Sequence, residues 1–514
     1  MAWSHRATVC LVLLGLGLGL AIFVLAVTLS HHCASCGPGA FAHAAFAADS
    51  KICSDIGRAI LQQQGSPTDA AIAALICTGV VNPQSMGLGG GVIFTIYSAT
   101  TGKVEVINAR ETVPASHVQG LLDQCKKAQP LGTGAQWIGV PGELRGYAEA
   151  HRRHGRLPWA QLFQPTIALL REGFRVPSVL SQYLSHNFLR PFLYSSSLSL
   201  LTVQDLAAFQ PEVVAPLEMA LGNYTLYSPP PPAGGAILNF ILNVLQGFNF
   251  SAETVARPEG KANMYHHLVE TLKFAIGQRW LLWDSYSRPG IQNTSQNLLG
   301  EALAQHIRQK IDGRGDHQLS HYNLIGVRGN RMGTSHVSVL GEDGSAVAAT
   351  STINTPFGAM VYSPRTGILL NNELLDLCWR HEPGSSATPP PGERPPSYMV
   401  PSILVNKAQG SKLVIGGAGG ELIMSAVVQT IMNKLWLGFD LTEAIAAPIL
   451  HVNSKGHVEY EPKFNEEVKK GLQDRGQSQS PRLFFLNSVQ AVSQEGPCVY
   501  AASDQRKAGK ASGY

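Results

Sequence analysis

The spacing of apolar residues predicts two helices near the start of the globular part of the chain. Residues 49–63 carry apolar side chains at helical spacing. A second helix is expected to follow, with Ser66 as its cap, Pro67 in its first turn and Asp69 three residues after the cap. Because its body, residues 70–77, is apolar on most sides, we expect this second helix to be buried between layers.

Alternation of apolar and polar residues predicts strands further along. Residues 335–340 alternate strictly and follow a flexible glycine, Gly333. Other strands are expected over residues 92–97, 103–108, 223–227, 345–353, 412–415, 484–492 and 499–502, and helices over 236–245, 265–283 and 421–435. The chain beyond residue 334 is therefore expected to be rich in strands.

Two glycine-rich stretches do not match nucleotide-binding motifs. Residues 87–91 run into a strand rather than a helix, so we expect their glycines to allow close packing and tight turning. Residues 416–420 lie between a strand and a helix, without the Lys of a P-loop or the third glycine of a dinucleotide fingerprint. Two interpretations stay open for them: close packing, which is the more common, or an oxyanion hole built from consecutive backbone N–H groups.

Residues 9–29 are almost wholly apolar and uncharged, and this run is long enough to cross a bilayer as a helix. The small residues at 42–47 that a signal peptidase would accept lie far downstream, and the run is longer than a usual signal sequence core. We therefore favour an uncleaved signal-anchor with the N-terminus inside over a cleaved signal. Both alternatives leave most of the chain outside the cytoplasm.

The charge balance and the potential metal ligands count against two functions, nucleic-acid binding and metal binding. The 39 Lys and Arg residues nearly balance the 35 Asp and Glu residues, and no long basic run occurs, so nucleic-acid binding has no electrostatic support. His267 and Glu270 are expected on one helix face, but they have no third ligand, so we expect no metal.

Sequons and cysteines agree with an extracytoplasmic location. Asn223, Asn249 and Asn293 each begin a sequon and are candidate glycosylation sites. Eight cysteines are compatible with an oxidising compartment. Cys53 and Cys77, on two neighbouring predicted helices, are the preferred disulfide, and the pairing of the other cysteines stays open.

Local signals for catalysis are modest. Thr334 can be interpreted as a nucleophile that becomes a new N-terminus when the Gly333–Thr334 bond breaks, although a Gly-Thr pair before a strand is usually an ordinary strand entry. The preceding segment, residues 312–330, is polar and is expected to be an exposed loop that can accommodate cleavage. Arg110, at the end of an apolar strand, is suited to grip a carboxylate, while a surface salt bridge is the more ordinary interpretation.

Taken together, the ordered motifs resemble one family, the γ-glutamyltransferases, which are N-terminal-nucleophile enzymes. The resemblance extends from about Ala42 to Tyr514. It rests on residues 82–91, 108–111, 333–336, 350–354, 371–373, 416–420, 502–504 and 513–514. Within the family, the chain is most similar to the members that act on leukotriene C4.

The resemblance implies an α/β fold, a four-layer αββα sandwich, made as one precursor and split autocatalytically between Gly333 and Thr334. The implied division is a cytoplasmic tail at residues 1–8, a transmembrane signal-anchor at 9–29, a stalk at 30–48, a large chain of the catalytic unit at 49–333 and a small chain at 334–514. The two chains would form a heterodimer on the outside of the plasma membrane, crossed once in type II orientation.

The resemblance also implies the catalytic groups. The α-amine of Thr334, with a pKa of about 7.7, would take the proton from the hydroxyl of the same residue and so activate that hydroxyl as a nucleophile. Thr352 corresponds to the threonine that hydrogen-bonds the nucleophile. Gly419 and Gly420 correspond to the oxyanion-hole amides, and the family uses no cofactor and no metal.

Substrate recognition follows from the same resemblance. Arg110 and Ser397 would hold the α-carboxylate of the donor, and its α-ammonium would be held by Asn354, Glu373 and Asp376. The implied donors are γ-glutamyl peptides: glutathione, its conjugates and leukotriene C4, which would give leukotriene D4. A γ-glutamyl-threonine ester would form, to be resolved by water or by an amino-acid or dipeptide acceptor.

Two departures from the family pattern leave alternatives open. Tyr398 stands where the family often has a second serine after Ser397, which is a hypothesis for altered donor binding. Between about Phe192 and Leu201 a helical stretch of the family's large chain is absent, so an unprocessed, inactive membrane glycoprotein is one alternative. Another amidase of the same superfamily, such as a cephalosporin-acylase-like hydrolase, is a second, although the arginine and the acidic pair favour an amino-acid head group.

Overall fold

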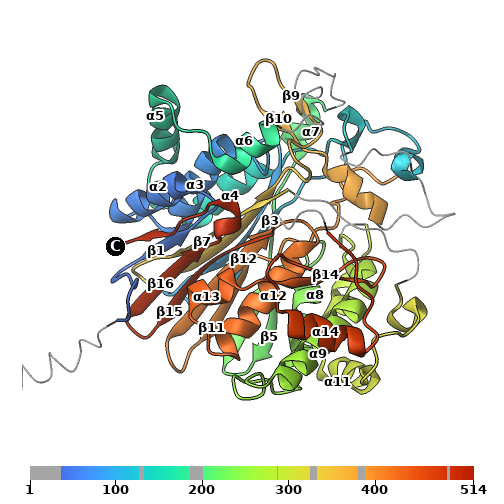
Figure 1. Ribbon diagram of the computed structural model, residues 1–514. Coiled ribbons are helices and arrows are strands. Elements are labelled where there is room, and N and C mark those ends of the chain that lie inside the picture. Colours follow the sequence, from blue (N-terminus) through green and yellow to red (C-terminus); the bar gives the residue numbers. More distant parts are fainter. Residues whose placement is uncertain are drawn as a thin grey trace, which may run out of the picture.

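The protein folds as helices packed on the outside of two stacked sheets, as Figure 1 shows for the computed structural model. The structure describes residues 36–126, 132–185, 201–285, 287–324, 333–379, 388–482 and 487–514. No helix within these ranges is both long and apolar enough to cross a membrane. The predicted tail (1–8), the predicted anchor (9–29) and the start of the stalk lie outside the described residues.

The first sheet has seven antiparallel strands in the order β17-β1-β7-β8-β2-β3-β4. The strand predicted after Gly333 is confirmed as β7 (Ser335–Leu340), which pairs along its length with β8 (Ala346–Thr352). The other members are β1 (Ala45–Ala47), β2 (Gly91–Tyr97), β3 (Val104–Ala109), β4 (Glu212–Val214) and β17 (Ser512–Gly513). Every residue of β7 and β8 is buried, so Thr334 leads into the interior of the fold.

The second sheet has six antiparallel strands in the order β16-β15-β12-β11-β6-β5. These are β5 (Leu217–Leu221), β6 (Tyr224–Ser228), β11 (Ser402–Asn406), β12 (Ser411–Ala418), β15 (Ser488–Glu495) and β16 (Cys498–Ser503). The predicted end of β12 at Ile415 is wrong. Gly416 and Gly417 continue to pair with β15, because a paired neighbour outweighs the weak strand preference of glycine. Two short pairs complete the sheets: β9 (Val361–Tyr362) with β10 (Leu369–Leu370), and β13 (Leu450–Val452) with β14 (Val458–Tyr460).

Helices α2 (Lys51–Gln62), α3 (Pro67–Val81) and α4 (Glu143–His154) pack on the outer face of the first sheet. The capping box predicted for α3 is present, because Ser66 accepts from the Asp69 amide while the Asp69 carboxylate accepts from the Ser66 amide. The predicted burial of α3 is confirmed. The expected disulfide between Cys53 and Cys77 ties α2 to α3.

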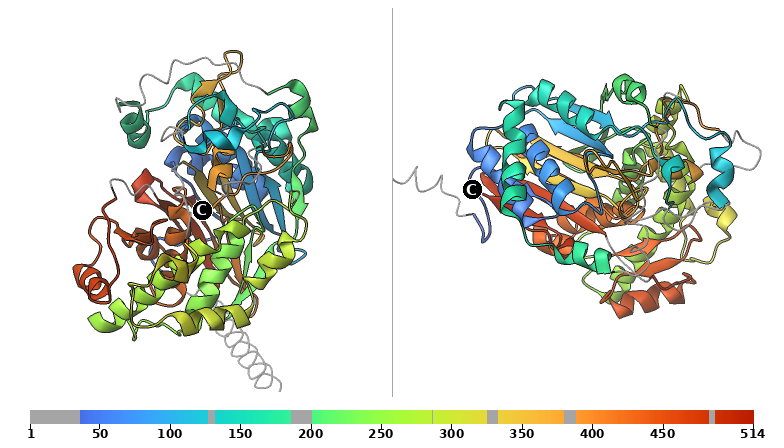
Figure 2. Two further views of the ribbon diagram at one scale, coloured as in Figure 1. Left: turned by 90° about the vertical axis from the view of Figure 1, so that its right-hand side faces the viewer. Right: turned by 90° about the horizontal axis from the view of Figure 1, so that it is seen from above.

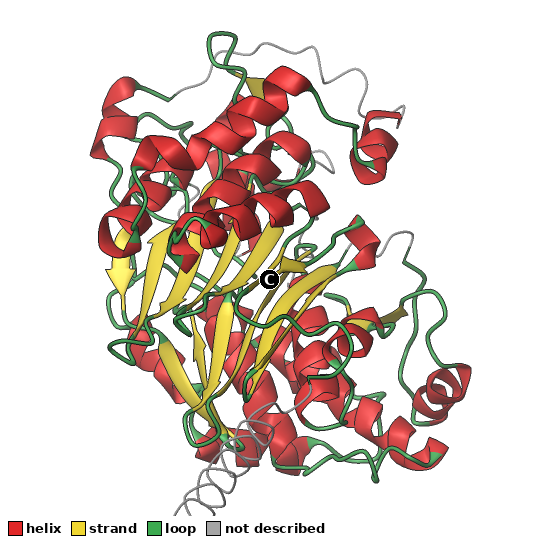
Figure 3. Ribbon diagram, turned by 90° about the vertical axis from the view of Figure 1, so that its left-hand side faces the viewer, coloured by secondary structure: helices red, strands yellow, loops and turns green. Residues whose placement is uncertain are grey.

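The outer face of the second sheet is covered by α8 (Gly235–Gln246), α12 (Leu422–Leu435) and α13 (Leu441–Ala446), with α9 (Pro258–Gly277) packed on α8. Apolar side chains of the two sheets meet in one cluster, for example Leu340 and Ala348 with Ile403 and Val414. The layers are therefore helix, sheet, sheet and helix (Figure 3), and Figure 2 shows the two helical layers on opposite sides of the sheets. This agrees with the expected four-layer α/β sandwich.

The remaining elements are helices and turns that flank or connect these layers. They are the helices α5 (Gln164–Glu172), α6 (Ser178–Ser185), α7 (Val203–Ala208), α10 (Ile291–Asn297), α11 (Glu301–Lys310) and α14 (Glu466–Asp474), and the 3-10 turns η1 (Leu121–Lys126), η2 (Ala135–Trp137), η3 (Trp159–Phe163), η4 (Arg279–Leu281), η5 (Leu319–Tyr322), η6 (Glu373–Trp379) and η7 (Gln505–Lys507). The side chains of Asn223, Asn249 and Asn293 belong to exposed residues, as glycosylation requires.

Two further disulfides, which sequence spacing left open, join distant parts of the chain. They are Cys36–Cys498 and Cys125–Cys378, with sequence separations of 462 and 253 residues. Each bridge connects a residue before the Gly333–Thr334 bond to a residue after it. A chain cut at that bond would therefore stay covalently linked.

The expectation of an exposed loop over residues 312–330 is wrong for part of it. Tyr322 is buried, and its hydroxyl donates to Oε2 of Glu270 at 2.6 Å. Glu270 is paired with the ammonium of Lys273 at 3.1 Å, so an internal polar network holds this segment against α9. Residues 325–330 lie outside the described part of the chain.

Candidate active site

Thr334 stands immediately before β7 and is buried, with 4% of its surface exposed. Its hydroxyl oxygen lies 3.3 Å from Oγ1 of Thr352, the last residue of the neighbouring strand β8. Oγ1 of Thr352 also accepts a hydrogen bond from the Asn354 amide at 2.8 Å. Two adjacent strands therefore bring the predicted nucleophile and its predicted hydroxyl partner together.

The backbone at the predicted cleavage point is strained. Thr334 has φ of 129°, a left-handed value that costs a β-branched residue on the order of 1–3 kcal/mol. A Cβ on Gly333 would lie 1.9 Å from the carbonyl oxygen of Asn354, so only glycine fits before Thr334. Strain of this kind persists only where the surroundings enforce it, which makes the Gly333–Thr334 bond a candidate for chemistry.

Gly419 and Gly420 form the turn between β12 and α12. Their φ values are 119° and 61°, which glycine adopts readily. Their carbonyls accept from the amides of Leu422 and Ile423, so the turn is tied into the start of the helix. Consecutive amides at a helix start are suited to stabilise an oxyanion. The structure thus shows packing at Gly416 and Gly417 and a turn geometry compatible with an oxyanion hole at Gly419 and Gly420.

One cavity, here called the nucleophile cavity, brings together most of the predicted site. It is lined by Arg110, Gly333, Thr334, Thr352, Asn354, Glu373, Asp376, Ser397, Tyr398, Met399, Gly420 and Ile423. Gly419 lines a neighbouring cavity instead. Residues far apart in the sequence thus share one enclosed space beside the hydroxyl of Thr334.

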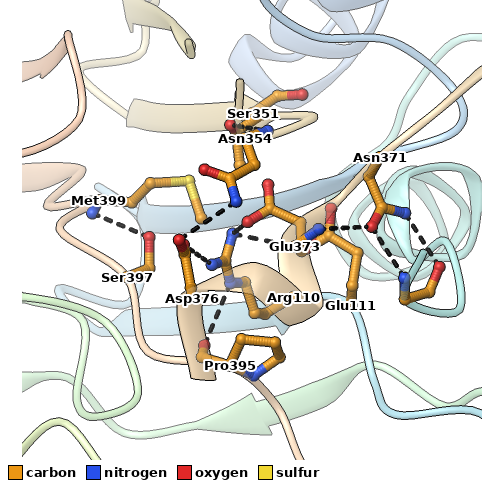
Figure 4. Close-up of polar contacts among 12 residues, drawn as sticks. Arg110, Glu111, Ser351, Asn354, Asn371, Glu373, Asp376, Pro395, Ser397 and Met399 are labelled. Carbon is orange, nitrogen blue, oxygen red and sulfur yellow. Dashed lines mark hydrogen bonds and ion pairs between the residues drawn. The ribbon is translucent and has the colours of Figure 1, made fainter. Parts of the chain in front are cut away.

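Arg110 is the centre of the polar contacts in Figure 4. Its Nη1 lies 2.7 Å from Oε2 of Glu373, and its Nη2 lies 2.9 Å from Oδ2 of Asp376. The carbonyl oxygens of Pro395 and Pro396 accept from Nε and Nη2 at 3.2 and 2.9 Å. Arg110 is 1% exposed, so the interpretation as a surface salt bridge is wrong: the salt bridges exist, but they are buried.

Carboxyl groups outnumber basic groups around Arg110. Three buried carboxyl groups, of Glu111, Glu373 and Asp376, lie within 3.5 Å of its guanidinium. Burial raises the pKa of Glu111 to about 7, and burial also raises the pKa of Glu373 well above its ordinary value, with Glu111 and Asp376 adding to the effect. Because isolated charge is costly in the interior, such a cluster favours a bound cation or proton.

Asparagines hold the acidic groups in place. Asn354 donates through Nδ2 to Oδ1 of Asp376 at 3.1 Å. Oδ1 of Asn371 accepts from the amides of Glu373 and Gly139, both at 3.0 Å, while Nδ2 of Asn371 donates to the carbonyl oxygen of Gly139 at 2.9 Å. Within residues 371–373, Asn371 therefore fixes the backbone of Glu373 and so positions its carboxylate.

Ser397 and Tyr398 differ in what they contact. The Ser397 hydroxyl accepts from the Met399 amide at 3.2 Å, which leaves its own proton available to a ligand. The Tyr398 ring stacks on Trp379 at 4.9 Å, and its hydroxyl accepts from Nη1 of Arg279 at 3.2 Å. Tyr398 thus adds an aromatic wall to the nucleophile cavity, while its hydroxyl is engaged with Arg279.

Two charged residues at the site were not among the predicted ones. Nζ of Lys507 donates to the carbonyl oxygen of Thr334 and to Oδ2 of Asp49 at 3.1 Å. Glu111 completes the acidic cluster around Arg110. Glu111 directly follows a predicted site residue, and Lys507 comes three residues after a motif that carries the resemblance. Their nearness to these motifs could have indicated them, but no sequence pattern pointed to their roles.

Comparison with known proteins identifies the family. A family model described as gamma-glutamyltranspeptidase matches residues 53–197 and 192–514. The chain is 77% identical over 572 residues to the glutathione hydrolase 5 proenzyme of Rattus norvegicus and 68% identical over 586 residues to the Homo sapiens protein of that name. Both alignments cover 100% of each chain.

The alignments also show that this chain is shorter than these relatives. It has 514 residues, fewer than the 572 positions of the alignment to the rat protein, so part of that alignment has no counterpart here. The two stretches that the family model matches meet at residues 192–197, where the sequence indicates a missing helical stretch. That join lies outside the described residues.

Among solved structures, the fold is similar to a cephalosporin acylase from Bacillus halodurans. The TM-score is 0.79 at 19% sequence identity, and the match covers 92% of this chain and 96% of that one. At so low an identity the likeness concerns the fold alone.

Proposed function

This chain belongs to the gamma-glutamyltranspeptidase family, and on this basis we propose that it is a γ-glutamyl hydrolase and transferase acting through Thr334. Its proposed donors are glutathione, glutathione conjugates and leukotriene C4, the last giving leukotriene D4. The names of the relatives support glutathione as a substrate, since both are glutathione hydrolase 5 proenzymes.

The main support for this function is that one cavity contains both a nucleophile and a set of charged side chains. The nucleophile cavity has a threonine hydroxyl at one position and an arginine with excess carboxylates at another. A γ-glutamyl donor carries an α-ammonium and an α-carboxylate. Its carboxylate can pair with Arg110 and its ammonium with Glu373, in place of the ion pair between these two residues. Asn354, Glu373 and Asp376 would then hold the ammonium, and Arg110 and Ser397 the carboxylate.

The proposed reaction uses groups that the chain itself supplies. Cleavage of the Gly333–Thr334 bond would free the α-amine of Thr334, which then accepts the proton of the hydroxyl as Oγ1 attacks the γ-carbonyl carbon. The Gly419 and Gly420 amides would stabilise the oxyanion. Collapse expels the amine of the leaving group with a proton, leaving a γ-glutamyl ester on Thr334 that water or an acceptor amine resolves.

We also propose a tail at residues 1–8, an anchor at 9–29 that holds the protein in the plasma membrane, and a catalytic part outside, divided into a large chain that ends at residue 333 and a small chain at 334–514. The predicted stalk, 30–48, is wrong at its end, because Ala45–Ala47 form β1 of the first sheet and belong to the catalytic unit. Support comes from the apolar run itself, from the exposed sequons and from the disulfides. Protease treatment of intact cells, with an epitope tag at the C-terminus, tests it: the tag should be lost from intact cells. A tag protected until the membrane is opened would contradict this orientation.

An unprocessed, inactive membrane glycoprotein is a second candidate. It is favoured by one observation, the shortfall against the relatives near residues 192–197. Such a protein would keep Thr334 in peptide linkage and have no free amine to activate it.

Substrate turnover separates these candidates. The purified full chain should release glutamate from glutathione, and the ratio of kcat/KM for leukotriene C4 to that for glutathione measures its preference. A Thr334→Ala variant, matched in expression, should release none. Equal, background-level release from both proteins would contradict the proposed function and favour the inactive glycoprotein.

A further inference from the structure

The 3-10 turn η6 contains two residues of the proposed donor site, Glu373 and Asp376. Side chains three residues apart lie on the same face of a 3-10 helix, so Glu373, Asp376 and Trp379 share one face. On this face both acids pair with Arg110 (Figure 4), and Trp379 stacks on Tyr398, a wall of the nucleophile cavity. One side of η6 therefore faces the proposed donor site.

The other side of η6 is apolar and packs against the part of the chain that precedes the Gly333–Thr334 bond. Leu374, Leu375, Leu377 and Cys378 are buried in one hydrophobic cluster. The cluster also contains Val113, Leu121, Leu122 and Trp137. The disulfide between Cys378 and Cys125, which lies in η1, fixes η6 to the same support. The turn is thus held from one side and presents its acids on the other.

The turn η6 depends on such support. It has seven residues, whereas 3-10 helices longer than three or four residues are uncommon, because their hydrogen bonds are poorly aligned. It also brings two carboxyl groups to one buried guanidinium, where Glu111 adds a third. Carboxylates that share a site repel one another. The covalent bridge at Cys378, two residues after Asp376, opposes this repulsion.

We propose that the Cys125–Cys378 disulfide is a positioning element of the donor site. It holds η6 so that the carboxyl groups of Glu373 and Asp376 contact the α-ammonium of the γ-glutamyl donor together. This bridge between the two chains would therefore set the donor KM in addition to linking the chains. The inference rests on the proposed function, because it requires that these two carboxyl groups bind the donor.

The proposal separates donor binding from the chemical step. Without the bridge η6 can shift, and a displacement on the order of 1 Å is enough to weaken the charge-assisted hydrogen bonds to the ammonium. Thr334 and Thr352 belong to the first sheet, and the Gly419–Gly420 turn leads into α12, so the reacting groups are held by other elements. Loss of the bridge should therefore raise KM and preserve kcat.

Donor kinetics of the full chain test the proposal, with Cys125→Ala and Cys378→Ala combined in one variant. Its KM for a γ-glutamyl anilide should rise about tenfold, while kcat should change by less than about twofold. Its KM for a glutaryl anilide, which lacks the α-amine, should equal that of the wild type. A merely structural role would instead lower the active fraction, which reduces kcat on both substrates and leaves each KM unchanged.

The matched control combines Cys36→Ala with Cys498→Ala, which removes the other bridge between the two chains. That bridge spans 462 residues of sequence, against 253 for the bridge at η6. Because the entropy of loop closure grows with loop length, a loss of stability alone should affect the control at least as strongly. The control should keep the wild-type KM for both anilides.

An unchanged γ-glutamyl KM in the test variant, or an equal rise in the control, would overturn the proposal. If the test variant does not mature into two chains, dithiothreitol can open the bridge in the matured wild-type protein, and mass spectrometry of alkylated aliquots identifies the reduced cysteines. The KM should rise as Cys125 and Cys378 become reduced, and a constant KM would overturn the proposal equally. A wild-type protein that releases no anilide would instead contradict the proposed function.

Discussion

The imidazole of His336 occupies the space that a side chain at Gly416 would need. A Cβ on Gly416 would lie 2.4 Å from Cε1 of His336. His336 belongs to β7 and Gly416 to β12, so this contact sets how closely the strand after Thr334 approaches the strand that leads into the Gly419–Gly420 turn. Burial lowers the pKa of His336 to about 3, which keeps the ring neutral at physiological pH.

Gly416→Ala should therefore destabilise the fold by about 1–3 kcal/mol, because the added methyl group overpacks the space between the sheets. Chain cleavage should slow as well, since the two strands that frame Thr334 must shift. Gly313→Ala is the matched control, because its Cβ would meet open space. Thermal unfolding measures the effect, and equal melting temperatures for the two variants would refute it.

Thr352→Val should lower kcat by about tenfold to a hundredfold, as expected when a hydrogen bond to a reacting group is lost. The change removes the oxygen that lies 3.3 Å from the Thr334 hydroxyl and preserves the shape of the side chain. Thr352→Ser keeps the hydroxyl and should retain most activity. Steady-state hydrolysis of a γ-glutamyl anilide measures both variants, and equal losses in them would mean that the hydroxyl of Thr352 has no role.

Glu373→Gln should raise the donor KM by about tenfold to a hundredfold, because it removes a charge that would pair with the donor ammonium. The comparison substrate is a glutaryl anilide, which lacks the α-amine. Its much weaker turnover should change little in the variant, because it has no ammonium to lose. A uniform loss on both substrates would instead assign Glu373 a purely structural role.

The stability of the folded protein should fall as pH rises toward 8, through Glu143. Burial raises the pKa of Glu143 from 4.5 to about 8, while the Tyr147 and Ser351 hydroxyls donate to its Oε1. Because the folded state binds this proton more tightly than the unfolded state, the stabilisation is complete below about pH 4.5 and is lost as pH rises through about 8. Glu143→Gln should show a smaller drop in melting temperature between pH 6 and pH 8.5 than the wild type. Identical drops would show that Glu143 does not titrate in this range.

Much of the local structure could be predicted from the sequence, because its signals lie a few residues apart. The capping box at Ser66, the strand after Gly333 and the Cys53–Cys77 disulfide are all of this kind. At the site, Thr334, Arg110 and the glycine turn had local signals, whereas Thr352, Asn354, Glu373, Asp376 and Ser397 were predicted only through resemblance to a family.

The pairing of the charged groups could not be predicted. Arg110 and Glu373 lie on segments far apart in the chain, and no periodicity encodes that they meet at 2.7 Å. The contact of Lys507 with the Thr334 carbonyl is equally non-local. The extension of β12 through Gly416 depends on two tertiary partners, β15 and His336, that override the weak strand preference of glycine.

The proposed function depends most directly on the release of Thr334 as a new N-terminus. The full chain should be separated under reducing conditions, because the Cys36–Cys498 and Cys125–Cys378 disulfides would otherwise hold its two parts together. N-terminal sequencing of the smaller fragment should then read Thr-Ser-His-Val, and a Thr334→Ala variant should give only the uncut chain. A wild-type protein that remains one chain, or a fragment that begins at another residue, would contradict the account.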